Sequence, residues 1–139
     1  MGLGEWLSRR NIMKFIKSRL RSFIYAFQGW YYVLHNEPNT WIHAVVTLLV
    51  IFCAFWLHLP ARDWAILLLA IIIVWAAEFF NTAIESIVDL VSPEPHPLAK
   101  AGKDAGAGAV LIAALTSVLI GLLILGPPLC EKVLLFLNW

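Results

Sequence analysis

The chain has 139 residues, a length typical of one soluble domain, but its composition excludes that class of protein. Hydrophobic residues make up 61% of the chain and charged residues 14%, whereas soluble proteins have about 45–50% and about 25%. A soluble domain of this size could not bury so much apolar surface. The net charge of +1 gives no excess that would favour nucleic acid as a partner. The sequence therefore predicts an integral membrane protein.

The first segment, from about residue 5 to residue 35, mixes apolar side chains with cations. The six basic residues before the first apolar run are Arg9, Arg10, Lys14, Lys17, Arg19 and Arg21. These cations interrupt the start of the chain, so it lacks the apolar region of a signal peptide. An amphipathic basic helix of this kind lies on a membrane surface with its cations toward anionic headgroups. We therefore expect an N-terminal surface helix.

Three apolar runs follow that are long enough to cross a bilayer. The predicted membrane spans are residues 42–59, 64–91 and 105–125. Pro60 ends the first span, and Asp63 is the expected N-cap of the second. Three prolines in the polar stretch after the second span should break the helix there. The third span should end at Gly126, before two prolines, and leave a short apolar tail along the opposite interface up to Trp139.

The positions of the remaining cations predict the orientation. The loop of residues 92–104 adds Lys100 and Lys103 to the six N-terminal cations, whereas Arg62 and Lys132 lie on the other side. With three spans, the positive-inside rule places the N-terminus in the cytoplasm. The predicted fold class is thus an all-α integral membrane protein with three transmembrane helices and an amphipathic surface helix.

A line of polar side chains marks one face of the second predicted span. Glu78, Asn81, Glu85 and Asp89 share this face at 100° per residue. Glu78 follows the uncharged run that begins at Trp64, and so lies roughly 21 Å along the helix. A charge at that depth costs about 3 kcal/mol or more if it faces lipid, so these side chains should face protein or water.

Three interpretations of this carboxylate line remain open from spacing alone. The line could form polar contacts between helices, a proton or ion pathway, or a catalytic site near the cytoplasmic face. Mg²⁺ takes one or two carboxylates together with phosphate oxygens, and Lys103 could meet phosphate as a point charge. Neither a Walker motif nor G-x-G-x-x-G is present. Gly102 and Gly106 favour a helix crossing, and Cys53 and Cys130 favour packing over a disulfide or a metal site.

The motifs of the second half resemble the prokaryotic diacylglycerol kinase family. EFFNTAIE, residues 78–85, is followed by Asp89 and then by HPLAKAGKDAGAGAV, residues 96–110. The second motif is most similar to the undecaprenol kinase branch of the family. Residues 36–43 resemble the family's N-E-x-N-(x)₃-H element, and SFIYAFQG, residues 22–29, resembles its surface-helix element.

The resemblance implies one membrane-embedded lipid kinase domain over residues 1–139, which assembles as a homotrimer with active sites shared between chains. It implies transfer of the γ-phosphate of ATP to a lipid alcohol with Mg²⁺, at the cytoplasmic face of a bacterial inner membrane. Undecaprenol is the first substrate expected and diacylglycerol the second. The non-enzyme alternative is a small helical proton channel or assembly protein.

The resemblance also assigns roles to individual residues. Glu78 matches the general base, and Glu37 and Glu85 match the metal-binding glutamates. Asn81 and Asp89 match supporting positions of the motif. The residues that match nucleotide-binding positions are Tyr25, Gly29, Glu37, Glu85, Glu94, Pro95, His96, Lys103 and Asp104. Either Arg19 or Arg21 is expected to meet phosphate. His43 is expected to be an interfacial or packing histidine rather than a site residue.

Overall fold

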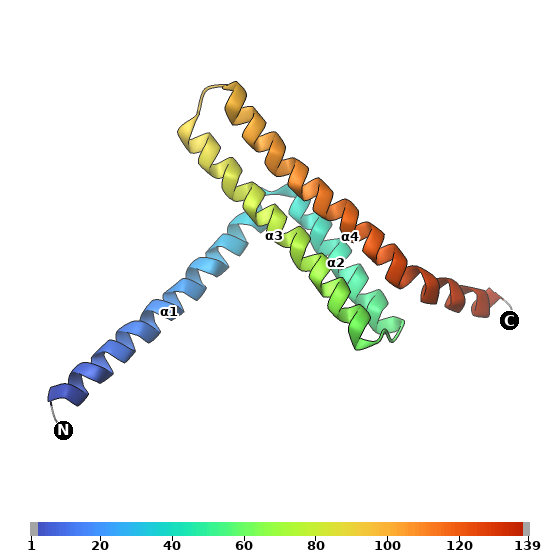
Figure 1. The fold of residues 1–139 in the computed structure, drawn as a ribbon, viewed down its shortest axis with the longest axis horizontal. Coiled ribbons are helices and arrows are strands. Elements are labelled where there is room, and N and C mark those ends of the chain that lie inside the picture. The colour runs from blue at the N-terminus through green and yellow to red at the C-terminus, as the bar shows by residue number, and fades with distance from the viewer. Residues whose placement is uncertain (1–2, 138–139) are drawn as a thin grey trace. The chain divides into compact units, whose positions relative to one another are not determined.

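The computed structural model describes the backbone of residues 3–137 and the side chains of residues 12–137. The helices of the described chain are α1 (Leu3–Asn36), α2 (Pro38–Trp56), α3 (Ala61–Val91) and α4 (Pro97–Leu137), as Figure 1 shows. The chain divides into two compact units, Met1–Pro38 and Asn39–Trp139. The all-α prediction is confirmed. The side chains of Arg9 and Arg10, and all of Trp139, lie outside the described residues.

The N-terminal unit is one long helix, α1, of 34 residues. Large apolar side chains such as Phe23 and Phe27 are exposed on it, and the guanidinium of Arg19 lies 5.2 Å from the centre of the Phe15 ring. The mixture of exposed apolar and basic side chains fits the predicted surface helix, because both kinds of side chain find partners at a membrane boundary. α1 ends where the backbone N–H of Glu37 bonds Val33 O at 3.0 Å.

Among the described helices, α2, α3 and α4 are long and apolar enough to cross a membrane. They have 19, 31 and 41 residues respectively. Large apolar side chains such as Leu48, Phe52 and Leu123 point outward and are exposed on the single chain. In lipid these side chains need no burial, whereas the backbone polar groups do need internal hydrogen bonds, which a helix provides. The prediction of three spans is confirmed.

The link between α2 and α3 is fixed by backbone hydrogen bonds. The N–H of Leu59 bonds Ala54 O at 3.2 Å and the N–H of His58 bonds Phe55 O at 3.1 Å, which is the Schellman pattern of a helix end. His58 holds the left-handed position of this motif with φ of 55°. Pro60 precedes the first residue of α3. The prediction that Asp63 is the N-cap is therefore wrong: it lies in the first turn, where a carboxylate is favourable to the helix dipole.

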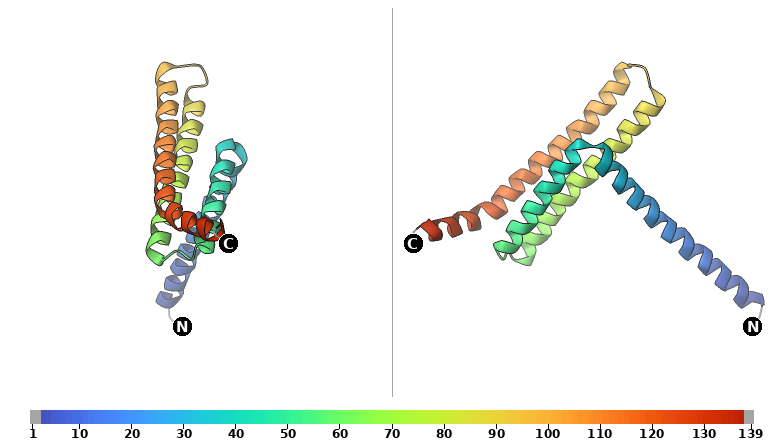
Figure 2. Two further views of the ribbon diagram at one scale, coloured as in Figure 1. Left: turned by 90° about the vertical axis from the view of Figure 1, so that its right-hand side faces the viewer. Right: turned by 180° about the vertical axis from the view of Figure 1, so that it is seen from behind.

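α3 and α4 form a long antiparallel hairpin, with α2 lying beside the part of it that is remote from the α3–α4 loop (Figures 1 and 2). Small side chains allow α3 and α4 to approach closely. Ala70 and Ala113 are buried, and the hydroxyl of Ser117 on α4 donates to Ala70 O on α3 at 3.1 Å. Leu67 and Val74 complete the buried face of α3. This arrangement is typical of membrane helices, where small residues drive close packing.

α4 is longer at both ends than the predicted third span. It begins at Pro97, because a proline at the first helical position needs no N–H donor and already has a helical φ. The expected helix end at Gly126 is also wrong, since α4 runs through Pro127 and Pro128, and Figure 1 shows the helix changing direction near its C-terminal end. Proline inside a helix removes a hydrogen bond and kinks the helix without necessarily ending it.

The last turns of α4 return to the end of α2. Lys132 Nζ donates to the backbone oxygen of Trp56 at 2.6 Å and lies 4.6 Å from the centre of its indole ring. A cation at a helix C-terminus satisfies a free carbonyl and interacts favourably with the helix dipole. The C-terminal segment that the sequence predicts as an interfacial tail is thus a helical cap for α2.

Candidate active site

Glu78 lies inside the bundle of the C-terminal unit, on the face of α3 that packs against its neighbours. It is 2% exposed. Its carboxylate Oε2 lies 4.0 Å from Nε2 of His43 on α2, and its backbone oxygen accepts a hydrogen bond from the Thr82 hydroxyl at 3.0 Å. The prediction that Glu78 faces protein rather than lipid is confirmed. A buried carboxylate with a basic ring beside it is a suitable position for proton transfer.

Asn81 connects the carboxylate line to α4. Its amide Nδ2 donates to Glu85 Oε1 at 3.1 Å, while its Oδ1 is buried without a hydrogen-bond partner. A Cβ atom at Gly106 on α4 would overlap with that same Oδ1. A side chain at this helix crossing would therefore displace the Asn81 amide, which is hydrogen-bonded to Glu85. The helix crossing that the sequence predicts from Gly102 and Gly106 is thus present at Gly106, whereas nothing lies within 4 Å of a Cβ at Gly102.

A surface pocket of about 760 Å³ opens where α3 passes into α4. Five of the nine residues that the resemblance assigned to nucleotide lie together here, and all five belong to the stretch of residues 94–104. The pocket is lined by Val88, Asp89, Ser92, Pro93, Glu94, Pro95, His96, Pro97, Ala99, Lys100, Lys103 and Asp104. Two hydrogen bonds shape its wall, from Ser92 Oγ to Glu94 O at 3.0 Å and from the N–H of Leu98 to His96 Nδ1 at 3.2 Å.

Two ion pairs lie among the residues that line this pocket. Lys103 Nζ contacts both carboxylate oxygens of Asp89, at 3.0 and 3.1 Å, and so joins α4 to α3. Lys100 pairs with Asp104 one turn along α4. Lys103 and Asp104, which the sequence predicts as a nucleotide-binding pair, therefore contact different residues: Lys103 pairs with Asp89 and Asp104 pairs with Lys100. Lys100 also lines the pocket, although the resemblance gives it no role. Its spacing of four residues from Asp104 is the usual signal for a helical ion pair.

The remaining predicted site residues belong to the N-terminal unit. Tyr25 and Gly29 lie four residues apart on α1, where the Tyr25 ring is exposed. Gly29 is open around its Cα, with nothing close to the position of a side chain. Glu37 is the half-buried residue between α1 and α2. Within residues 12–137 no group of three or more Asp, Glu, His and Cys side chains is close enough to hold a metal ion. A metal held here would need oxygens from its substrate as well.

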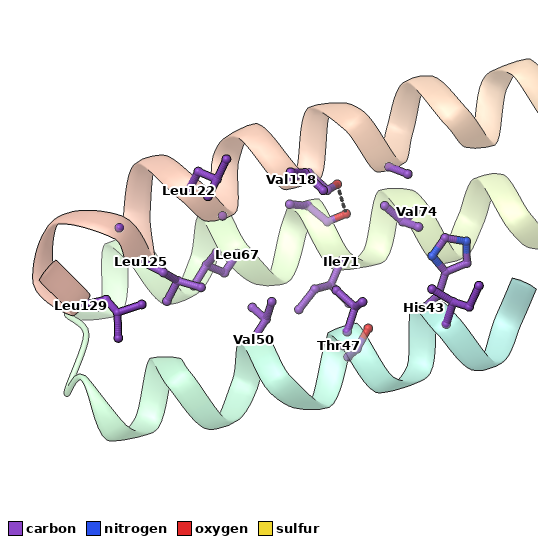
Figure 3. A pocket seen from close by; sticks show the side chains of 17 residues that line it. His43, Thr47, Val50, Leu67, Ile71, Val74, Val118, Leu122, Leu125 and Leu129 are labelled. Atoms are coloured by element: carbon purple, nitrogen blue, oxygen red, sulfur yellow. Dashed lines mark hydrogen bonds between the residues drawn. The ribbon is translucent and has the colours of Figure 1, made fainter. Parts of the chain in front are cut away.

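An apolar cavity of about 470 Å³ lies between α2, α3 and α4 (Figure 3). Its few polar side chains are His43, Thr47 and Ser117. Thr47 accepts a hydrogen bond from Trp75 Nε1 at 3.1 Å, and Ser117 is bonded to α3, so both hydroxyls are satisfied. His43 lies at one end of the cavity, and its ring is thus shared between this apolar space and the Glu78 carboxylate.

Known proteins match this chain over most of its length. The family model for prokaryotic diacylglycerol kinase matches residues 24–125. An undecaprenol kinase of Bacillus subtilis (strain 168) is 41% identical over 121 residues, which cover 87% of this chain and 95% of the relative. A diacylglycerol kinase of Synechocystis sp. is 43% identical over 122 residues, or 87% of this chain and 70% of the relative. A diacylglycerol kinase of Escherichia coli (strain K12) is 34% identical over 95 residues, which cover 68% of this chain and 78% of the relative.

These matches, together with the three apolar helices, define an integral membrane lipid kinase. The chain belongs to the prokaryotic diacylglycerol kinase family. The family predicted from the motifs is confirmed, and so is the interpretation of the chain as an enzyme rather than a channel or an assembly protein.

Proposed function

We propose that this chain transfers the γ-phosphate of ATP to the hydroxyl of undecaprenol and so produces undecaprenyl phosphate. The observation that carries the choice of lipid is the Bacillus subtilis undecaprenol kinase, because the match extends over 95% of that relative. Diacylglycerol is the second candidate, since the Synechocystis diacylglycerol kinase is equally similar in the matched part, at 43% identity. The apolar cavity beside Glu78 supports a substrate with a long hydrocarbon chain in either case.

Glu78 is the proposed general base. It accepts the proton of the lipid hydroxyl while the hydroxyl oxygen forms a bond to the γ-phosphorus. The bond from that phosphorus to the β,γ-bridging oxygen breaks, and its electron pair leaves with ADP. Burial among α2 and α3 keeps water away from the carboxylate, so that the lipid hydroxyl is the available proton donor. The proton on Glu78 is then released once the phosphorylated lipid has left and water can reach the carboxylate, before the next turnover.

The nucleotide is proposed to bind at the pocket between α3 and α4. Lys103 would neutralise charge on the phosphates, while residues 94–96 would contact the nucleotide from the loop. Because Lys103 is paired with Asp89 in the free chain, binding of the phosphates would exchange one anionic partner of the lysine for another. Tyr25, Gly29 and one of Arg19 and Arg21 are proposed to approach the nucleotide from α1.

Magnesium is the proposed metal ion, bound together with ATP. Glu85 fits this ion by its chemistry, because it offers a partly exposed carboxylate whose orientation is fixed by Asn81 and Mg²⁺ prefers such oxygen ligands. Glu37 is the second proposed ligand. When bound, Mg²⁺ would neutralise charge that develops on the transferring phosphate. Asn81 acts here by holding Glu85, whereas Asp89 would pair with Lys103 until the phosphates replace it.

The proposed assembly is a homotrimer in a bacterial cytoplasmic membrane, with the N-terminus in the cytoplasm. Many large apolar side chains of α2 and α4 are exposed on the single chain, and contact with lipid or with further copies would cover them. The excess of cations before α2 and in the first turns of α4 supports the cytoplasmic position of the N-terminus.

A side-by-side substrate assay tests the proposed function. The purified full chain in detergent micelles receives Mg-ATP and either undecaprenol or diacylglycerol, and the phosphorylated lipid is measured. We expect phosphate transfer to both alcohols with a higher kcat/KM for undecaprenol. A higher kcat/KM for diacylglycerol would replace the substrate with the second candidate. Failure to phosphorylate either lipid would refute the proposal.

The roles of the two buried-face glutamates are separated by one pair of variants. Glu78→Gln should lower kcat by about 10²–10⁴-fold, the usual contribution of a general base, and leave Mg-ATP binding intact. Glu85→Gln should weaken Mg-ATP binding instead. Equal losses of Mg-ATP binding in both variants would show that the two roles are assigned wrongly.

A further inference from the structure

The position of His43 suggests a role that the motif match does not give it. His43 lies on α2, and Nε2 of its ring is 4.0 Å from Oε2 of Glu78 on α3. Its side chain is 17% exposed, against 3% for the side chain of Glu78. A carboxylate buried to this degree is costly unless another group is paired with it. Of the side chains in residues 12–137, His43 provides the ion-pair partner of Glu78.

A second contact fixes the alignment of the two helices at this level. One turn further along α2, the hydroxyl of Thr47 accepts the Trp75 indole N–H at 3.1 Å. Trp75 precedes Glu78 by three residues on α3, so the two contacts follow one another in antiparallel register. This hydrogen bond joins α2 to α3 in an otherwise apolar interface. The His43 imidazole follows one turn away on the same side of α2, 4.0 Å from Glu78, and Figure 3 shows it at one end of the cavity.

The other titratable groups on α2, α3 and α4 lie away from His43 and Glu78 along their helices, and these two residues therefore face each other as a pair. On α3 the nearest carboxylate on the same face is Glu85, two turns away, and it accepts a hydrogen bond from Asn81. α4 carries no titratable residue between residues 105 and 129. On α2, the titratable residue after His43 is Cys53, which lies near the other end of that helix, ten residues away.

We propose that His43 is a positioning residue for Glu78 in the phosphoryl transfer described above, on which this inference rests. The ring N–H at Nε2 donates to Glu78 Oε2 in the reacting complex, and the other carboxylate oxygen is thereby directed to the lipid hydroxyl. The distance of 4.0 Å belongs to the free chain, and hydrogen bonds of catalytic groups commonly tighten when substrate binds. His43 also forms one end of the apolar cavity, so the arriving lipid would bring the two groups together.

Two substitutions at His43 test this role in the full chain with lipid alcohol and Mg-ATP. His43→Leu keeps the apolar volume but removes the N–H, and should lower kcat by up to about 10²-fold, the cost of misplacing a reacting group by about 1 Å. KM for Mg-ATP should stay unchanged. His43→Gln returns an N–H donor at a similar distance from the backbone, and should recover most of the lost kcat. A structural role alone would not distinguish these two side chains.

Cys53→Ala is the control on the same helix, because Cys53 is half-buried and does not line the apolar cavity. It removes a small side-chain group far along α2 from His43 and should cost at most about 1 kcal/mol of stability, measured by thermal unfolding in detergent, while kcat is retained. His43→Asn, whose amide is too short to reach Glu78, replaces the leucine variant if the latter does not fold, with the same loss of kcat expected.

Three outcomes would overturn the role of His43. These are wild-type kcat in His43→Leu, equal loss in His43→Leu and His43→Gln, or a loss in Cys53→Ala as large as that in His43→Leu. The proposed function fails separately, if the wild-type chain phosphorylates neither lipid alcohol, and the role of His43 then fails with it.

Discussion

Gly106 is the position where the smallest substitution should have the clearest effect. In Gly106→Ala the new Cβ would overlap with Asn81 Oδ1, and it would also meet Asn81 Cγ at 3.5 Å. The nearest relief is rotation of the Asn81 amide, which breaks its hydrogen bond to Glu85. Gly108→Ala is the control, because nothing lies within 4 Å of a Cβ at Gly108 on the same helix.

The magnitude follows from the difference between these two variants. Alanine stabilises a helix by about 0.5–1 kcal/mol relative to glycine, and this gain is common to both. Overpacking adds about 1–3 kcal/mol of destabilisation at Gly106, so Gly106→Ala should be less stable than Gly108→Ala by that amount. The lost bond from Asn81 to the charged Glu85 is worth about 1.5–3 kcal/mol. If that loss falls on Mg-ATP binding, KM rises about 10- to 100-fold.

Two measurements on each variant check this reasoning. Thermal unfolding in detergent, followed by circular dichroism, gives the difference in stability, and initial rates at varied Mg-ATP give KM. Gly108→Ala should be as stable as the wild-type chain or slightly more stable, with an unchanged KM. If Gly106→Ala matched Gly108→Ala in both stability and KM, the close approach of α4 to Asn81 would be irrelevant to the site.

Three further substitutions test contacts elsewhere in the chain. Lys132→Met removes the cap on the Trp56 carbonyl and should lower the thermal stability by about 1–2 kcal/mol with kcat retained; an unchanged melting temperature would contradict this role. Asp89→Asn releases Lys103 from its ion pair and should lower KM for Mg-ATP, whereas a raised KM would mean that Asp89 itself supports the nucleotide. His58→Gly relieves the left-handed backbone and should stabilise the fold by about 1 kcal/mol, whereas a lower unfolding temperature would show that the His58 side chain matters more.

The parts of the fold that were predicted correctly depend on local sequence. The three spans follow from uninterrupted apolar runs, and the inward direction of Glu78 follows from its depth in such a run. The helix ends were predicted less well, because they depend on backbone hydrogen bonds that composition does not reveal. Pro97 begins α4 and Pro127 lies inside it, although the sequence suggested that proline would keep both segments out of the helix.

The candidate site was predictable where a motif is contiguous and less so where helices meet. The contiguous residues Glu94 to His96, which the resemblance assigned to nucleotide, together line the pocket between α3 and α4. By contrast, the partners of Lys103 and of Glu78 lie on other helices, at Asp89 and His43. These pairings depend on the register of α2 and α4 against α3, which the spacing along one helix does not determine.

The length of α3 ties the chemistry to the thickness of the membrane. Its 31 residues form one uninterrupted helix, about 46 Å long at 1.5 Å per residue, whereas the hydrocarbon core is about 30 Å thick. Trp64 near one end and Asp89 near the other therefore belong to one continuous helix. Glu78 keeps a constant depth below the headgroups only in a bilayer whose thickness matches the length of this helix. A thicker bilayer forces the helix to become more upright, and a thinner one forces it to tilt. Turnover in liposomes should accordingly pass through a maximum as the acyl chains of the host lipid are lengthened, and a rate independent of chain length would contradict this coupling.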